Sequence, residues 1–287
     1  MIIVTGTKRS GTSMWMKLLI EAGFPPFGCA FPKNCGKTIR YANPGGFDEP
    51  DLREGVYHGT NPHPRTGHYL FPEKTRRHAL KVFVPGLIRT DRAYIDRVVA
   101  TMRPWREYVR SLDRLYSMER EAMDAQRENG ALRVPPPAQI PAALEWWTHN
   151  FSLISDVVTR RYPMFMVAYD SVVESPDDTL REVFSWLGDG DVCRAIAEVR
   201  PQLRTQDQDR LGPADDAASG LEPEVIEAFD ALYDTVLRRR QLDQLLVDRL
   251  NATNELLAER IDHAFREVSR QRHERMELIR AARSKAA

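Results

Sequence analysis

The sequence has little cysteine and no long apolar run. Only Cys29, Cys35 and Cys193 occur among 287 residues, which is too few and too scattered for a disulfide framework or a zinc site. No stretch approaches the about eighteen apolar residues of a membrane span, and the first residues do not resemble a secretion signal. We therefore expect a cytoplasmic protein without a membrane span, its thiols reduced; a Cys29–Cys35 bridge is the alternative.

Net charge is also absent, since Lys plus Arg and Asp plus Glu both number 41. A neutral chain has no general attraction to nucleic acid or to acidic membranes. We expect no nucleic-acid partner, and any anion must be bound by a local cluster of charge.

Short apolar segments alternate with amphipathic ones along the first two thirds of the chain. The patterns predict strands at 2–4, 79–86, 96–104 and 163–170, and helices at 14–20, 87–95, 105–128, 142–160 and 175–188. In the last helix Ser175 is the expected N-cap, and Gly188 lies just past the end. This alternation indicates an α/β fold whose central parallel sheet carries helices on both faces.

The segment from residue 222 onward differs in composition, being rich in Arg, Glu, Leu and Ala. It predicts one or two long helices that pack on the core and then project. We divide the chain into an α/β domain at 1–221 and a helical extension at 222–287. The extension would serve a homodimer contact, or else be a solvated tail.

Residues 4–13, "VTGTKRSGTS", form a glycine-containing loop between a predicted strand and a helix. Gly6 and Gly11 have the spacing of a nucleotide-phosphate loop, and Ser13 fills its hydroxyl position, but Thr12 replaces the usual lysine. Positive charge lies instead inside the loop, at Lys8 and Arg9. The pattern indicates an anion site rather than a magnesium triphosphate site; the alternative is an ordinary tight turn.

A second candidate anion site follows the strand at 96–104. Arg103 stands at its carboxyl end, and Ser111 lies two turns into the next helix. Ligands of open parallel sheets bind outside the carboxyl ends of the strands, so both side chains can reach one crevice. Trp146 and Trp147 are interpreted as core residues rather than a base-stacking platform.

Together these motifs resemble the sulfotransferase family that uses 3′-phosphoadenosine 5′-phosphosulfate (PAPS). The resemblance covers residues 1 to about 205 and includes "NPGGFDEP" and "VAYDSVVESPDDTLREVFSWLG". It implies a P-loop-like fold and a metal-independent transfer of a sulfuryl group. The motif at Arg9, Ser10, Gly11, Thr12 and Ser13, with Lys8 beside it, would hold the 5′-phosphosulfate. Arg103, Ser111 and a late arginine, Arg204, would hold the 3′-phosphate.

The chain departs from this family in its second strand. Members often carry Lys-x-His there, whereas this sequence has Lys81 followed by Phe83 in the histidine position. Lys81 would still neutralise charge near the transferred group, but the base must come from elsewhere. Glu49 is the first candidate and Asp48 the second. The weaker candidates are His58, His63 and His68.

The acceptor and two competing functions stay open. The loop from Phe24 to Phe71 suits a small-molecule or glycan acceptor with a hydroxyl or amine group. One alternative is a phosphoryl-transfer enzyme that uses Lys8 for phosphate and Asp170 for magnesium. The other is a non-catalytic nucleotide-binding scaffold.

Overall fold

The computed structural model describes residues 1–27, 67, 69–128, 138–200 and 220–286. Four parallel strands form one sheet with the order β2-β1-β3-β4 within these residues. The strands are β1 (Ile2–Gly6), β2 (Ala79–Lys81), β3 (Arg97–Met102) and β4 (Met164–Ala168). The α/β class and the parallel sheet predicted from the sequence are therefore confirmed.

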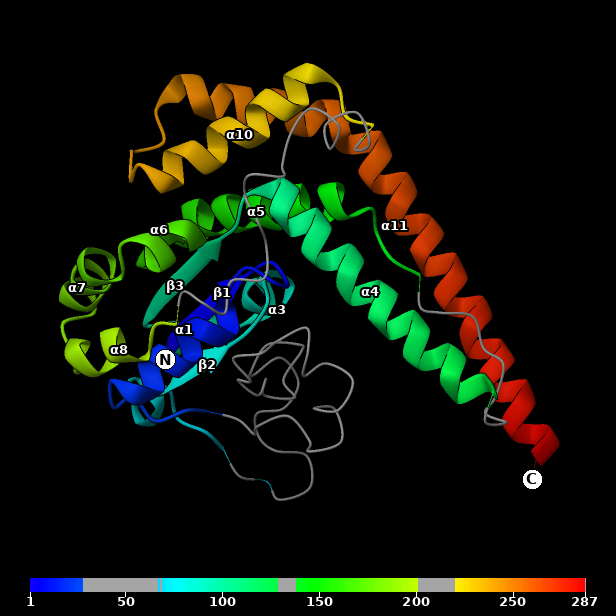
Figure 1. Cartoon of the computed structure of the whole chain (residues 1–287), viewed down its shortest axis with the longest axis horizontal. Coiled ribbons are helices and arrows are strands. Elements are labelled where there is room, and N and C mark those ends of the chain that lie inside the picture. The colour runs from blue at the N-terminus through cyan, green and yellow to red at the C-terminus, as the bar shows by residue number, and fades with distance from the viewer. Residues whose placement is uncertain (28–66, 68, 129–137, 201–219, 287) are drawn as a thin grey trace.

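Helices cover both faces of this sheet (Figure 1). They are α1 (Thr12–Glu21), α3 (Val84–Arg89), α4 (Trp105–Glu128), α5 (Ala142–Arg160), α6 (Tyr169–Glu174), α7 (Pro176–Leu187), α8 (Val192–Glu198), α10 (Pro223–Leu237) and α11 (Gln244–Ala286). Two short 3₁₀ helices, η1 (Pro72–Thr75) and η2 (Arg92–Tyr94), flank β2 and α3.

The period-two alternation of strand side chains divides the core between the two faces. Ile2 and Val4 of β1 pack with α1, α7 and α8 on one face. Ile3, together with Val98 and Ala100 of β3, packs with α3 and α5 on the other. Because both faces are apolar, each strand is a nearly continuous hydrophobic run, as expected for a covered parallel sheet.

Some predicted boundaries were wrong. The strand predicted at 79–86 ends at Lys81, and Val84 already begins α3, where Pro85 fits the first turn of a helix. The following stretch to residue 95 is divided between α3 and η2 rather than forming one helix. The last predicted strand also ends early, and Tyr169 and Asp170 belong to α6. Ser175 precedes α7 as predicted, but its side chain makes no capping hydrogen bond.

The C-terminal helices join the main core before they project from it. α10 and the first part of α11 lie over α5, whereas the rest of α11 runs to the distant C-terminus (Figure 1). Phe229 of α10 is fully buried and stacks on Trp147, with ring centroids 4.8 Å apart. Leu250 and Leu257 of α11 are buried in the same cluster. No helix in the described part of the chain is long and apolar enough to cross a membrane.

Candidate functional site

The candidate site lies where the strand order of the sheet reverses. β1 and β3 are neighbours, but the chain leaves β1 toward β2 and leaves β3 toward β4 on the opposite side. Helices α1 and α4, which follow these two strands, belong to different core clusters. Such a reversal leaves a crevice at the carboxyl ends of the strands, where open α/β sheets bind ligands.

The loop from Gly6 to Gly11 passes over this crevice in close contact with β3. A Cβ atom at Gly6 would lie 2.4 Å from the Thr101 carbonyl oxygen, and one at Gly11 would lie 2.8 Å from Cδ2 of Tyr169. Both glycines are therefore required by the close approach of neighbouring atoms, and Gly11 also has a φ of 94°. The Thr101 hydroxyl donates to the Ser10 carbonyl over 2.8 Å, and the Ser10 hydroxyl donates to the Thr7 carbonyl over 2.7 Å.

Arg9 occupies the left-handed region of backbone conformation, with φ 64°. For a residue with a Cβ atom this conformation costs about 1–2 kcal/mol, so the surroundings must hold it. The Arg9 carbonyl accepts a hydrogen bond from Nη1 of Arg103 at 3.2 Å. The Arg9 side chain donates from Nε to the Ser111 hydroxyl at 3.2 Å.

Helix α1 begins inside the loop and directs its N-terminus toward the crevice. Gly11 is the N-cap and provides no side-chain capping bond, and the first backbone N–H groups of a helix have no acceptor within it. On the β2 side, the Lys81 ammonium donates to the Ser13 hydroxyl at 2.8 Å and lies over the Phe83 ring. A lysine and the first N–H groups of a helix, gathered at one helix end, are suited to an anion.

Arg103 is the central cation of the β3 side. Its side chain is 5% exposed and forms an ion pair from Nε to the fully buried Glu107 over 2.8 Å. Its guanidinium lies over the ring of Tyr169, with 4.7 Å between the carbon atom and the ring centroid. Nη2 is buried and has no hydrogen-bond partner among the described residues. An unpaired buried donor is costly, so this nitrogen is suited to a ligand oxygen.

The structure thus brings together the two motifs that the sequence predicted separately. Arg9 reaches Ser111 across 102 positions of the sequence, and Arg103 reaches Arg9 across 94. Ser10, Thr12 and Ser13 lie in the same loop and the first turn of α1. Two clusters therefore flank the N-terminus of α1: Lys81 with Ser13 on one side, and Arg9 with Arg103 and Ser111 on the other.

Sequence reasoning missed a polar cluster on α4 and α5 that contacts the loop. Nζ of Lys8 lies 3.1 Å from Oε1 of Glu145 and 3.5 Å from the hydroxyl of Tyr116. Burial is the largest single influence and would lower the pKa of Lys8, but the charges and hydrogen bonds of Glu145 and Tyr116 together outweigh it, and the pKa is raised. Burial and the same carboxylate raise the pKa of Tyr108. Glu145 lies on the buried, mostly apolar face of α5, and that position was the available signal.

Other residues singled out in the sequence have structural roles. Trp146 and Trp147 are fully buried and stack on Phe229, which confirms their interpretation as core residues. The Asp170 carboxylate accepts a hydrogen bond from the Tyr233 hydroxyl at 2.7 Å and so ties α6 to α10. Among the described residues, no group of three or more His, Cys, Asp or Glu side chains is placed to hold a metal ion.

Several predicted site residues lie outside the described part of the chain. They are Glu49, Asp48, His58, His63, His68 and Arg204, together with Cys29, Cys35 and most of the loop from Phe24 to Phe71. Their predicted roles stay predictions.

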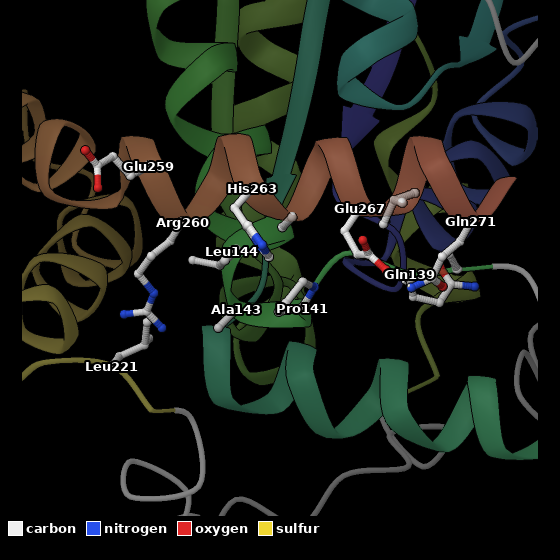
Figure 2. Close-up of a pocket in the computed structure, with 13 residues that line it drawn as sticks. Gln139, Pro141, Ala143, Leu144, Leu221, Glu259, Arg260, His263, Glu267 and Gln271 are labelled. Atoms are coloured by element: carbon white, nitrogen blue, oxygen red, sulfur yellow. Dashed lines mark hydrogen bonds between the residues drawn. The ribbon is translucent and has the colours of Figure 1, made fainter. Parts of the chain in front are cut away.

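A separate cavity of about 670 Å³ lies between the start of α5 and the middle of α11, and none of the loop residues lines it (Figure 2). Two of its charged side chains, Arg260 and Glu267, are paired locally. Arg260 forms an ion pair with Glu222 at 3.0 Å. Hydrogen bonds from Arg270 and Gln271 lower the pKa of Glu267 to about 2. Because these charges already have partners, we assign the cavity no ligand.

Comparison with known proteins identifies no relative: no family model, no curated protein and no solved structure matches this chain.

Proposed function

We propose that this protein is a sulfotransferase that uses PAPS as donor and an acceptor hydroxyl or amine. One observation carries the proposal: the Arg-Ser-Gly-Thr-Ser loop and the Arg103–Ser111 pair, both typical of that family, are hydrogen-bonded to each other at one crevice. Arg9 donates to Ser111, and Arg103 donates to the Arg9 carbonyl. An accidental match to either motif would not require the two to meet.

The residues present fit a ligand with two separate phosphate groups. The N-terminus of α1, with Ser13 and Lys81 beside it, would hold the 5′-phosphosulfate, since these donors lie at one helix end. Ser111 and Nη2 of Arg103 would hold the 3′-phosphate. Glu107 already accepts a hydrogen bond from Nε of Arg103, and the Arg9 carbonyl accepts one from Nη1. Among the described residues, Nη2 is the guanidinium nitrogen without a partner, and it can make this contact.

When bound, PAPS supplies a sulfuryl group already attached to a good leaving phosphate. In the transfer, the bond from sulfur to the bridging oxygen breaks and a bond from sulfur to the acceptor atom forms. Arg9 and Lys81 would offset the negative charge that builds on the leaving phosphate. The acceptor proton passes to a base, for which Glu49 stays the first candidate. This chemistry needs positioning and charge rather than a metal ion.

The phosphoryl-transfer alternative is less well supported because its two key residues are engaged elsewhere. Asp170, its magnesium ligand, accepts a hydrogen bond from Tyr233, and Lys8, its phosphate ligand, pairs with Glu145. The non-catalytic scaffold would bind the nucleotide in the same place.

A homodimer through α11 also belongs to the proposal, and light scattering on the full chain tests it.

Calorimetric titration with 3′-phosphoadenosine 5′-phosphate (PAP), in parallel with ATP and in the presence of a chelator, tests the function. We expect micromolar binding of PAP and none of ATP. Binding of ATP alone, restored by magnesium, would contradict the sulfotransferase and support a kinase. Binding of PAP without sulfation of any acceptor in a broad screen would favour the scaffold.

A further inference from the structure

We propose that Glu145 is a positioning residue for the phosphate loop: through Lys8 it fixes the left-handed turn at Arg9 and so directs Arg9 toward Ser111. The proposal deepens the proposed function, on which its ligand-binding part rests. It starts from the position of a carboxylate that is 6% exposed on α5 and yet pairs with a residue of the loop after β1.

The surroundings of Glu145 make this pair more than a surface contact. A buried carboxylate is strongly unfavourable unless it is paired and hydrogen-bonded. Lys8 provides the pairing charge at 3.1 Å, and the Tyr116 hydroxyl contacts the same ammonium group. Lys8 is the more exposed member of the pair, with 39% of its side chain exposed against 7% for Glu145. The carboxylate is therefore fixed in the core, and the loop is the part that it can hold in place.

The backbone of the loop shows what this anchor does. Arg9, directly after Lys8, has the left-handed φ of 64°, which is unfavourable for a residue with a side chain. After the turn, the loop is held to β3 through the carbonyls of Arg9 and Ser10. Before the turn, the ion pair of Lys8 holds the loop to α5. Fixing both sides of Arg9 keeps its guanidinium in contact with Ser111.

The same geometry argues against Glu145 as the missing base. Its carboxylate is nearly inaccessible, and its charge is already matched by Lys8. A group that takes a proton from an acceptor must reach it within hydrogen-bonding distance, whereas Glu145 is covered. Its effect on the reaction is indirect, through Lys8 and Arg9.

Three explanations predict different effects of Glu145→Gln on PAP affinity. Positioning predicts weaker binding, with a Kd raised about tenfold, because the loop loses its anchor. A purely electrostatic role predicts tighter binding, since a negative charge near two phosphates is removed. A role in stability alone predicts a lower melting temperature with an unchanged Kd. Tighter binding or an unchanged Kd would overturn the proposal.

Further variants test whether Lys8 and Glu145 affect PAP binding through their shared ion pair. Lys8→Met should raise the Kd about as much as Glu145→Gln, and the double variant should be no worse than either single variant, because both remove one interaction. Lys8→Arg keeps the pair and should stay within about twofold of wild type. Glu198→Gln is the matched control, since it breaks a lysine pair on α1, with Lys17, that does not involve the loop. A double variant about a hundredfold weaker would contradict the coupling.

A measurement on the ligand-free protein tests the positioning role of Glu145 independently of the proposed function. Amide resonances of Gly6 and Gly11 report the loop conformation in the free protein, and Glu145→Gln should shift both while Glu198→Gln leaves them in place. If wild type does not bind PAP, the proposed function fails, and these resonances still decide the positioning role. Unshifted resonances in Glu145→Gln would overturn it.

Discussion

Gly11 is a loop residue at which the structure clearly excludes a side chain. It combines a left-handed φ of 94° with close contact to Tyr169, whose ring also lies under the guanidinium of Arg103. Tyr169 therefore couples the loop to the β3 side of the site.

Gly11→Ala should lower the unfolding free energy by more than the cost of backbone strain alone. Gly23 is a matched control, because its φ of 95° is nearly the same but a Cβ atom there would meet nothing within 4 Å. We expect Gly23→Ala to cost about 1–2 kcal/mol of unfolding free energy. Gly11→Ala should cost more and also abolish PAP binding, since the added methyl group displaces Tyr169. Urea unfolding and calorimetry measure both effects. Equal losses for the two variants would show that Tyr169 moves freely.

Arg9 is the residue whose removal should separate catalysis from binding. Under the proposed function its charge matters most when the leaving phosphate becomes more negative. We expect Arg9→Ala to lower kcat about a hundredfold while the Kd for PAP rises only about tenfold, as in Glu145→Gln. Steady-state kinetics with a responsive acceptor and calorimetry provide the two numbers. Turnover near that of wild type would show that the loop has been assigned wrongly.

At the scale of elements, local patterns predicted the long helices better than the short helices and strands. α4 and α5 begin and end where the sequence predicted, since each has a clear apolar face bounded by prolines or a strand end. β2 is shorter than predicted because Val84 to Gly86, apolar residues at the expected end of a buried strand, form the first turn of α3 instead. A short apolar run does not distinguish a strand from a buried helical turn.

Pairings between distant elements could not be predicted from the sequence. The Lys8–Glu145 ion pair and the hydrogen bond from Tyr233 to Asp170 join residues whose spacing carries no periodic signal. The two anion motifs could be placed at one crevice only because the parallel sheet and its strand ends were predicted. The site was thus partly predicted, and the anchor that holds its loop was not.

Among the buried residues of α10, Phe229 makes the aromatic contacts with the core. Phe229 stacks on Trp147 and Trp146 and meets Trp105 edge to face. We expect Phe229→Ala to cost about 3–5 kcal/mol, as for other buried phenylalanines. Phe265→Ala on α11 is the control, since that ring is 40% exposed and should cost less than about 1 kcal/mol. Urea unfolding monitored by tryptophan fluorescence measures the difference. Similar costs would mean that α10 is only loosely attached.

At the scale of the whole molecule, α11 has two parts with different relations to the core. Leu250 and Leu257 are at most 2% exposed, and Asn254 accepts a hydrogen bond from the Trp147 indole. Farther along, Met276 and Leu278 are 43% and 52% exposed. The first part of the helix is therefore a component of the α/β core, whereas the second part projects from it (Figure 1).

Two truncations should separate these parts. Ending the chain after residue 269 removes mostly exposed side chains, so melting temperature and PAP affinity should stay close to those of the full chain. Ending it after residue 243 removes both buried leucines, each worth about 1.5–3 kcal/mol. That loss is a large fraction of the about 5–15 kcal/mol that stabilises a typical domain, and we expect a chain that melts early or fails to fold. Calorimetric melting curves distinguish the outcomes. A stable, PAP-binding chain ending at residue 243 would show that the α/β core needs only α10 to cover its tryptophans.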